Sequence, residues 1–146
     1  MNLVQDVYEW LSTAGTTVDE NMIPLSINLV DEEVDELKQA IANRDKKETM
    51  DAIADIFWVT MNVAYFSGIN PREMFEYFDK VSDSNWSKFT TDEFTAQLTV
   101  EAYAEGTHPD KPGVKIDTQY DKVGMWYVIR NKETGKILKS IDYKKL

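Results

Sequence analysis

The sequence contains no cysteine, which excludes disulfides and thiolate metal sites. It has no apolar run near the roughly 20 residues that a membrane span needs, and residues 1–6 lack the basic and apolar regions of a signal peptide. Basic residues are scarce, with 16 Lys and Arg against 26 Asp and Glu, and the net charge of −10 argues against binding nucleic acid through a broad basic surface. These absences predict a cytoplasmic protein without a nucleic-acid or membrane partner.

What the chain does have is a high density of acids in two segments that should be helical. Residues 31–36 read Asp-Glu-Glu-Val-Asp-Glu, and like charges at helical spacing repel one another. A second set, Glu48, Asp51 and Asp55, follows about one helix later inside a mostly apolar run. Two helices that point carboxylates at each other need a compensating cation. A hard divalent ion, Mg²⁺ or Mn²⁺, is the simplest one.

The spacing of apolar and helix-terminating residues predicts a mainly α protein. Helices are expected at residues 3–13, 25–43, 46–66, 71–81 and 92–105, with a polar loop at 83–89. Residues 125–130 and 136–141 are predicted to be two strands joined by a turn. We therefore expect a helical catalytic domain at residues 1–106 and a small C-terminal β-hairpin extension at 107–146, packed on the same domain.

Helical phase predicts which acids face the core. At about 100° per residue, Glu33 falls near the middle of the apolar arc of the helix at 25–43. Glu36 and Glu32 fall at one edge of this arc, whereas Asp31 and Asp35 fall outside it. We therefore expect Glu33 and Glu36 to face inward, and Asp31 and Asp35 to be ordinary surface charges.

The helix at 46–66 carries a polar stripe formed by Glu48, Asp51, Asp55 and Asn62, which lie within about 60° of one another. A short turn makes the two helices antiparallel neighbours, so their acidic edges can meet in one cluster. The alternative is a solvated acidic face, or acids that pair with the basic residues near the turn: Lys38, Arg44, Lys46 and Lys47.

These residues carry a family resemblance. The motif Glu32-Glu33-x-x-Glu36, followed by a helix that contains residues 51–58, resembles the MazG-like all-α nucleoside triphosphate pyrophosphohydrolases, and implies an all-α NTP pyrophosphatase-like helical bundle. The wider match is to the phosphoribosyl-ATP pyrophosphohydrolase-like branch, which carries Ser-Asn-x-x-Lys and Gly-Lys-x-x-Lys-Ser segments, matched here at residues 84–88 and 135–140. One position departs from the usual family form: Ala52 stands where a Glu is common, and the nearest acid is Asp51.

The resemblance implies cleavage of a nucleoside triphosphate between the α and β phosphorus, giving the monophosphate and pyrophosphate. It implies Mg²⁺, with Mn²⁺ as the alternative ion, held by acids of both helices: Glu33, Glu36, Glu48, Asp51 and Asp55. The acids expected to take part in the reaction are Glu32, Glu33 and Glu36. Among them, Glu32 could accept a proton from the attacking water or bind a second metal.

The same resemblance suggests residues that bind the substrate. Lys88 and Lys139 would meet the outer phosphates, with Asn85 as a hydrogen-bond donor. Asn62 could reach the sugar or base, and a tryptophan, Trp58 or Trp86, could stack on the base, although core packing explains each tryptophan equally well. His108, in a loop rich in proline and glycine, is expected to have no chemical role.

Several alternatives stay open at this point. Phosphoribosyl-ATP is the alternative substrate, because the acidic motif serves both reactions. A non-catalytic acidic helical module that binds a basic partner is the alternative outside the enzymes, and it predicts outward-facing acids. Relatives in the family form dimers or tetramers, so a homo-oligomer is expected.

Overall fold

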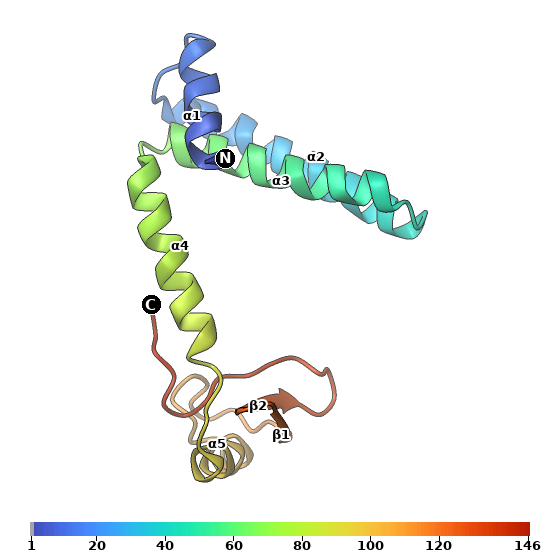
Figure 1. Cartoon of the computed structure of the whole chain (residues 1–146), viewed down its shortest axis with the longest axis vertical. Helices are drawn as coiled ribbons and strands as arrows, with labels where there is room; N and C mark the ends of the chain where they lie inside the picture. Colours follow the sequence, from blue (N-terminus) through green and yellow to red (C-terminus); the bar gives the residue numbers. More distant parts are fainter. Residues whose placement is uncertain (1) are drawn as a thin grey trace. The chain divides into compact units, whose positions relative to one another are not determined.

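The computed structural model describes residues 2–146, which form five α-helices, a short 3-10 helix and a two-stranded sheet (Figure 1). In chain order the elements are α1 (Leu3–Thr13), η1 (Glu20–Met22), α2 (Ile23–Ala42), α3 (Lys46–Phe66), α4 (Pro71–Trp86), α5 (Glu93–Glu105), β1 (Thr118–Val123) and β2 (Trp126–Asn131). The predicted mainly α class with a small C-terminal hairpin is confirmed. Within the described residues, none of the helices has the length and apolar character needed to cross a membrane.

The chain divides into two compact units, an N-terminal unit that ends at Glu76 and a C-terminal unit, Tyr77–Leu146. The N-terminal unit holds 15 of the 26 acidic residues and only 5 of the 16 basic ones, so the whole net charge of −10 belongs to it. The C-terminal unit has no net charge. The predicted division into domains at 1–106 and 107–146 stays a prediction, because compact units do not define domains by themselves.

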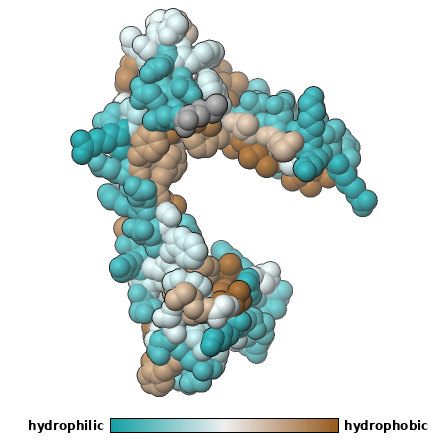
Figure 2. Space-filling view, viewed as in Figure 1, coloured by the Kyte–Doolittle hydropathy of each residue, from teal (hydrophilic) through white to brown (hydrophobic). Residues whose placement is uncertain are grey.

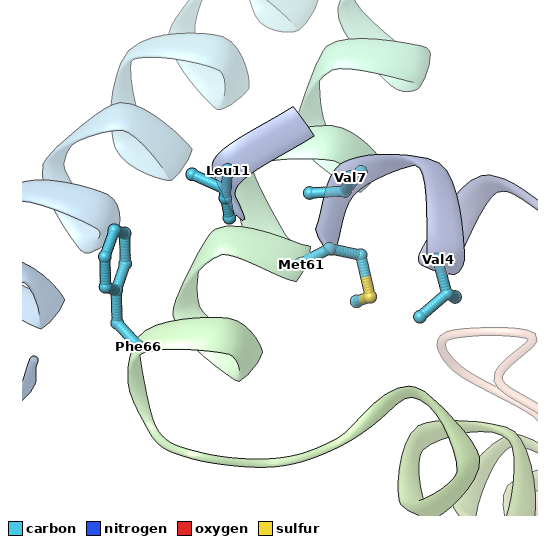
Figure 3. Close-up of a cluster of buried hydrophobic side chains, with 5 residues drawn as sticks. All are labelled: Val4, Val7, Leu11, Met61 and Phe66. Carbon is cyan, nitrogen blue, oxygen red and sulfur yellow. The ribbon is translucent and has the colours of Figure 1, made fainter. Parts of the chain in front are cut away.

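The core of the N-terminal unit forms where α1 packs against the C-terminal half of α3 (Figure 3). The buried side chains of α1 are Val4, Val7 and Leu11, whose spacing places them on one face of the helix. They cluster with Met61 and Phe66 of α3. This packing fixes the C-terminal end of α3 and leaves its acidic N-terminal half outside the main core.

α2 and α3 form an antiparallel hairpin joined by a tight turn at residues 43–45 (Figure 1). In this turn, Arg44 adopts a left-handed φ of 55°. Asp45 then caps α3, because its carboxylate accepts a hydrogen bond from the Glu48 N–H at 3.0 Å. Small buried side chains, Ser26 on α2 and Ala52 on α3, leave room for the two helices to approach. The hairpin brings the two acid-rich segments side by side, as predicted.

α4 begins where the sequence predicts but ends later. A capping box forms its start: the Glu73 N–H donates to Asn70 Oδ1 at 3.0 Å, and the Asn70 N–H donates to the Glu73 carboxylate at 2.8 Å. The predicted end near residue 81 is wrong, because α4 continues to Trp86. Residues 82–85 have low helix propensity, but a tertiary contact supports the last turn: Ser84 Oγ donates to the Lys144 carbonyl at 3.1 Å.

In the C-terminal unit, α5 packs on a hairpin formed by β1 and β2, around a core of Tyr103, Ile129 and Leu138. The strand predicted at residues 125–130 is confirmed as β2. Its predicted partner at 136–141 is wrong, because β2 pairs antiparallel with β1, and Ile137 makes only an isolated bridge to Arg130. Most residues of β1 are exposed, so the strand carries no alternating apolar pattern that would have indicated it.

Candidate functional site

Glu33 lies in the packed seam between α2 and α3, and its surroundings are acidic. It is half-buried, and its Oε2 atom is fully buried with no hydrogen-bond partner among residues 2–146. Burial raises the pKa of the Glu33 carboxyl, and the negative charges of four neighbours raise it further, in the order Glu36, Asp55, Glu32 and Asp51. Acids from both helices therefore act on one buried carboxylate, as the helical phase predicts.

The neighbours of Glu33 are exposed and border one edge of the α2–α3 hairpin. The expectation that Glu36 faces inward is wrong, because Glu36 lies on the exposed side of the seam that buries Glu33. Asp31 and Asp35 are exposed, as predicted. Glu48 lies nearer the turn, where it lines a hollow of about 310 Å³ together with Glu36, Gln39, Ala40, Asn43 and Asp45.

No lysine or arginine within residues 2–146 forms an ion pair with any of the six predicted site acids. Lys38, one of the basic residues near the turn, pairs instead with Asp35 at 2.7 Å. With the side chains as they stand, no group of three or more acidic or histidine residues in this part of the chain is close enough to hold a metal ion. The acids lie along one edge of the α2–α3 hairpin, but their carboxylate oxygens are not close enough together to bind one ion.

The residues present nevertheless fit a hard divalent cation. Glu33 supplies a buried oxygen without a partner, and every surrounding donor is a carboxylate oxygen, the ligand type that Mg²⁺ and Mn²⁺ prefer. The side chains of Glu36, Asp51 and Asp55 are exposed, and within residues 2–146 none of them makes a hydrogen bond or ion pair that would hold it in place. Rotation of these side chains would therefore change the distances from their carboxylates to that of Glu33.

Two further predicted residues of α3 lie in the N-terminal unit. Trp58 is half-buried, packs against the core cluster and meets the ring of Trp10 edge-on at 5.9 Å. This packing accounts for Trp58 without a ligand, so its role in binding a base stays a prediction. Asn62 is buried, and its Oδ1 atom has no hydrogen-bond partner. Like Glu33, it is a buried acceptor on the α2–α3 hairpin that the described residues leave unsatisfied.

The comparisons with known proteins point to one family. Residues 12–82 match a family model described as phosphoribosyl-ATP pyrophosphohydrolase. This segment is a phosphoribosyl-ATP pyrophosphohydrolase family domain. The family belongs to the MazG-like all-α NTP pyrophosphohydrolase superfamily. No curated protein and no solved structure matches the chain.

The phosphoribosyl-ATP pyrophosphohydrolase domain contains all the predicted acids, as well as Trp58 and Asn62. The family supports a pyrophosphohydrolase activity in general, and its members are typically dependent on a divalent metal. Four predicted residues lie beyond the matched segment, in the C-terminal unit: Asn85, Trp86, Lys88 and Lys139.

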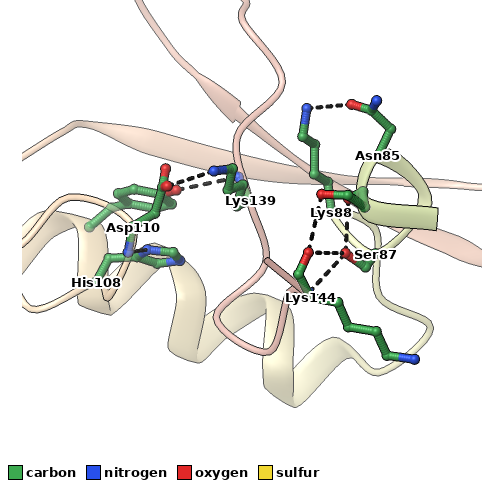
Figure 4. A network of polar contacts seen from close by, with 9 residues as sticks. Asn85, Ser87, Lys88, His108, Asp110, Lys139 and Lys144 are labelled. Carbon is green, nitrogen blue, oxygen red and sulfur yellow. Dashed lines mark hydrogen bonds and ion pairs between the residues drawn. The ribbon is translucent and has the colours of Figure 1, made fainter. Parts of the chain in front are cut away.

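Lys139 forms an ion pair with Asp110 (Figure 4). Its Nζ lies 2.7 Å from Asp110 Oδ1, and both side chains are largely buried. Burial raises the pKa of the Asp110 carboxyl, but the hydrogen bond and charge of Lys139 more than offset this, so the pKa is lowered overall. Sequence reasoning missed Asp110, which follows His108 in a loop far from Lys139 in the sequence. A phosphate at Lys139 would have to compete with this carboxylate.

Lys88 and Asn85 form a separate pair, in which Lys88 Nζ donates to Asn85 Oδ1 at 2.7 Å (Figure 4). Asn85 is anchored in turn, because its Nδ2 donates to the Val81 carbonyl at 2.9 Å on α4. Lys88 makes no ion pair within the described residues, so its charge stays available.

His108 is fully buried in the C-terminal unit, and its expected lack of a chemical role stays a prediction. Its ring stacks on that of Tyr103, with the centroids 3.9 Å apart and the planes 5° from parallel. Its Nδ1 accepts a hydrogen bond from the Asp110 N–H at 3.1 Å, which holds the loop that presents Asp110 to Lys139. Burial lowers the pKa of His108.

Proposed function

We propose that the protein hydrolyses a nucleoside triphosphate, or a deoxynucleoside triphosphate, at the α–β phosphate linkage, giving the monophosphate and pyrophosphate. The observation that supports this most is the buried, unpartnered Oε2 of Glu33 among four other carboxylates, inside a pyrophosphohydrolase family domain. Like charges gathered without a basic partner cost stability, and a bound cation would offset that cost.

The residues proposed to hold Mg²⁺, or Mn²⁺, are Glu33, Glu36, Glu48, Asp51 and Asp55. When bound, the ion would polarise the phosphate oxygens and offset the charge of the triphosphate. Glu33 is held in the seam between α2 and α3, so it would fix the position of the site, while the exposed acids adjust around it. Glu32 is proposed to accept the proton of the attacking water.

Phosphoribosyl-ATP is the second candidate substrate, and the description of the matching family favours it. Both candidates are anionic triphosphates that carry a base, and the acids would serve either. Asn62 on α3, with its unpartnered Oδ1, is proposed to accept a hydrogen bond from the sugar or base. Lys139 is proposed to reach a phosphate only if that phosphate displaces Asp110.

The activity is tested by measuring pyrophosphate release from a panel of NTPs, dNTPs and phosphoribosyl-ATP, with Mg²⁺ or Mn²⁺. We expect release from one or a few of them. Asp55→Asn should lower the rate by about two orders of magnitude, because one metal-binding carboxylate is lost. Asp31→Asn, an exposed acid of α2 outside the site, is the matched control and should leave the rate unchanged. Absence of release from every substrate would favour the non-catalytic acidic module.

We also propose that the protein is a homo-oligomer. Figure 2 shows hydrophobic side chains along one side of the α2–α3 hairpin. Ile27 and Ile41 of α2 and Ile53 of α3 are exposed, and helical phase places them on the edge opposite the acids. Light scattering would test this: Ile53→Asp should give monomers, whereas Asn28→Asp, on the outer face of α2, should not. A monomeric wild-type protein would refute the proposal.

A further inference from the structure

The β-hairpin of the C-terminal unit has one covered edge and one edge without a partner. Its sheet contains only β1 and β2, which pair antiparallel over their whole length. On the outer edge of β2, Tyr127 exchanges two backbone hydrogen bonds with Thr90, of 3.3 and 2.6 Å. The Ile129 carbonyl, on the same edge, accepts a hydrogen bond from the Leu138 N–H at 2.9 Å. Within residues 2–146, no backbone group of β1 makes such a bond outside the hairpin.

The register of the hairpin shows which backbone groups of β1 face outward. In an antiparallel pair, two residues directly opposite each other point their N–H and C=O groups either toward each other or both away. Tyr127 and Ile129 direct theirs away from β1. Their partners in the register are Lys122 and Tyr120, and Thr118 follows by the same alternation. These three residues of β1 therefore present the N–H and C=O groups of an unpaired edge.

The side chains of the edge residues point to the α5 side of the sheet rather than across the edge. The Tyr120 hydroxyl donates a hydrogen bond to Glu93 of α5 at 3.1 Å, and Thr118 lies two residues away on the same side. Side chains stand perpendicular to a sheet, which accounts for the burial of Thr118 and the half-burial of Tyr120. The hydrogen-bonding edge lies in the plane of the sheet, so these side chains do not occupy it.

Little in β1 blocks the approach of another strand. Its sequence contains no proline, and its one-to-one register with β2 leaves no bulge. A lysine on an edge can prevent pairing, but Lys122 lies over the ring of Tyr127 in its own hairpin, with Nζ 5.6 Å from the centroid. Gln119, Asp121 and Val123, on the side away from α5, are exposed. An edge of this kind accepts an additional strand.

The edge is complementary to itself. In a second copy related by a two-fold axis at Tyr120, this residue lies opposite its own counterpart, and Thr118 lies opposite Lys122. Each of these pairs joins outward-facing groups, so every unpaired N–H and C=O of the edge would gain a partner. On the other side of the strand, Gln119 would lie opposite Asp121, which places an amide donor against a carboxylate.

Charge disfavours the other two-fold registers. Residues directly opposite each other point to the same side of a sheet, so the axis must pass between one residue and its own counterpart. An axis at Asp121 or at Lys122 would place that charge opposite itself. An axis at Gln119 would place Asp117 opposite Asp121. Like charges directly opposite each other destabilise a strand pair, which leaves the axis at Tyr120.

We infer that β1 of one molecule pairs antiparallel with β1 of a second copy about an axis at Tyr120, so that the two hairpins form one continuous sheet. The contact differs from association through the α2–α3 hairpin, because all its residues lie in the C-terminal unit. Backbone hydrogen bonds gain little over those with water, and association costs entropy. We therefore expect a dissociation constant on the order of 0.1–1 mM, so Ile53→Asp stays monomeric at micromolar concentration.

The test is disulfide trapping in the full chain, which has no cysteine of its own. Gln119→Cys and Asp121→Cys are made separately, mixed at a concentration near the expected dissociation constant and oxidised. Their Cα atoms would lie about 4.5 Å apart in the pair, which a disulfide can span. Each position lies about 7–8 Å from its own counterpart, on the diagonal. We expect the heterodimer, identified by mass, to exceed either homodimer about tenfold, since the diagonal distance is too long for a disulfide.

Two matched controls define the register and the edge. Asp121→Cys mixed with Val123→Cys, both exposed on the same side of β1, should give dimers in statistical proportion. Adding Lys122→Pro to the first pair removes an outward N–H but no hydrogen bond within the hairpin, so the hairpin should still form. Lys122→Pro should abolish the excess of heterodimer, whereas Lys122→Gln, which keeps the N–H, should not.

Three results would overturn the inference. The first is a statistical proportion of dimers from Gln119→Cys and Asp121→Cys. The second is an excess of heterodimer that Lys122→Pro leaves unchanged. The third comes from repeating the mixture in the Ile53→Asp background, where the excess should persist. Its loss there would show that the two β1 strands meet only when the helices associate.

Discussion

Glu33 on α2 lies near enough to Asp55 on α3 for the charge of Asp55 to raise the pKa of the Glu33 carboxyl. The two residues are more than 20 positions apart in the sequence, and the α2–α3 hairpin brings them together. A carboxyl whose pKa is raised on folding contributes stability while it is protonated and loses it as the pH rises through the folded-state pKa. The metal-free protein therefore has an electrostatic cost at this site at neutral pH.

Removing the charge of Glu33 should stabilise the metal-free protein. We expect Glu33→Gln to raise the free energy of unfolding by about 1 kcal/mol at pH 7 in EDTA, because several unfavourable charge pairs are lost at once. Urea denaturation measures this change. Asp31→Asn, which removes an exposed charge from the same helix, should change stability less. A variant less stable than the wild type would show that Glu33 is not repelled by its neighbours.

Binding of a divalent metal should stabilise the protein, because the ion would offset the repulsion between the acids around Glu33. Since a ligand that binds only the folded state stabilises it, millimolar Mg²⁺ or Mn²⁺ should raise the melting temperature of the wild type. Asp55→Asn and Glu33→Gln should reduce the increase, whereas Asp31→Asn should keep it. Differential scanning calorimetry with and without EDTA is the measurement. An increase of the same size in all four proteins would indicate general screening of the acidic surface rather than a site.

Local signals in the sequence predict the helices well, and tertiary contacts explain the errors. Asp45 caps α3, and a turn at Ser67 and Gly68 ends it, so both ends of α3 are as predicted. Helical phase predicted correctly that Glu33 faces inward, because Glu33 lies where two long helices pack against each other. The strand β1 was missed because most of its side chains are exposed, although it pairs with β2 over its whole length, and its residues carry no alternating apolar pattern.

The errors at the site have the same origin. Helical phase places Glu36 at the edge of the apolar arc of α2, but it does not show how much of that arc α3 covers. In the structure Glu33 is half-buried, whereas Glu36 is exposed. Nothing local to Lys139 reveals that Asp110 neutralises it, because 29 residues separate the two. The net negative charge of the N-terminal unit and the neutrality of the C-terminal unit also follow from the sequence, but only once the boundary between the two units is known.

Buried His108 should make the C-terminal unit sensitive to mild acid. Its folded-state pKa is lowered, so the unfolded chain binds a proton more readily, and stability falls as the pH falls below the unfolded-state pKa of about 6.5. We expect up to about 1 kcal/mol less stability at pH 5.5 than at pH 7.5. The other charged groups that face His108, Asp110 and Lys139, do not titrate in this window because their pKa values are lowered and raised respectively.

The pH dependence is measured by urea denaturation at intervals between pH 5.5 and 7.5, followed by a near-ultraviolet signal from the aromatic residues. His108 is the one histidine of the chain, which makes the assignment direct. His108→Gln should flatten the profile over this range, even if it lowers stability at every pH. A slope that survives in this variant would assign the effect to carboxylates instead.

The ion pair between Lys139 and Asp110 should contribute to the stability of the C-terminal unit, whatever its part in binding phosphate. Its side chains are 31% and 18% exposed, whereas those of Lys132 and Asp117, an ion pair of 3.1 Å in the same unit, are 48% and 79% exposed. Lys139→Met leaves the Asp110 carboxylate largely buried without its partner, so we expect a loss of about 1–2 kcal/mol. Lys132→Met should cost well under about 1 kcal/mol, because exposed pairs contribute little.

The double variant Lys139→Met with Asp110→Asn separates packing from charge. If the unpaired carboxylate causes the loss, the second substitution should restore part of the stability that Lys139→Met removes, because no buried charge then remains. Equal losses in the single and the double variant would assign the effect to the contact of Lys139 with the Tyr143 ring, whose centroid lies 4.6 Å from Nζ. Urea denaturation of the two single variants, the double variant and Lys132→Met decides between these causes.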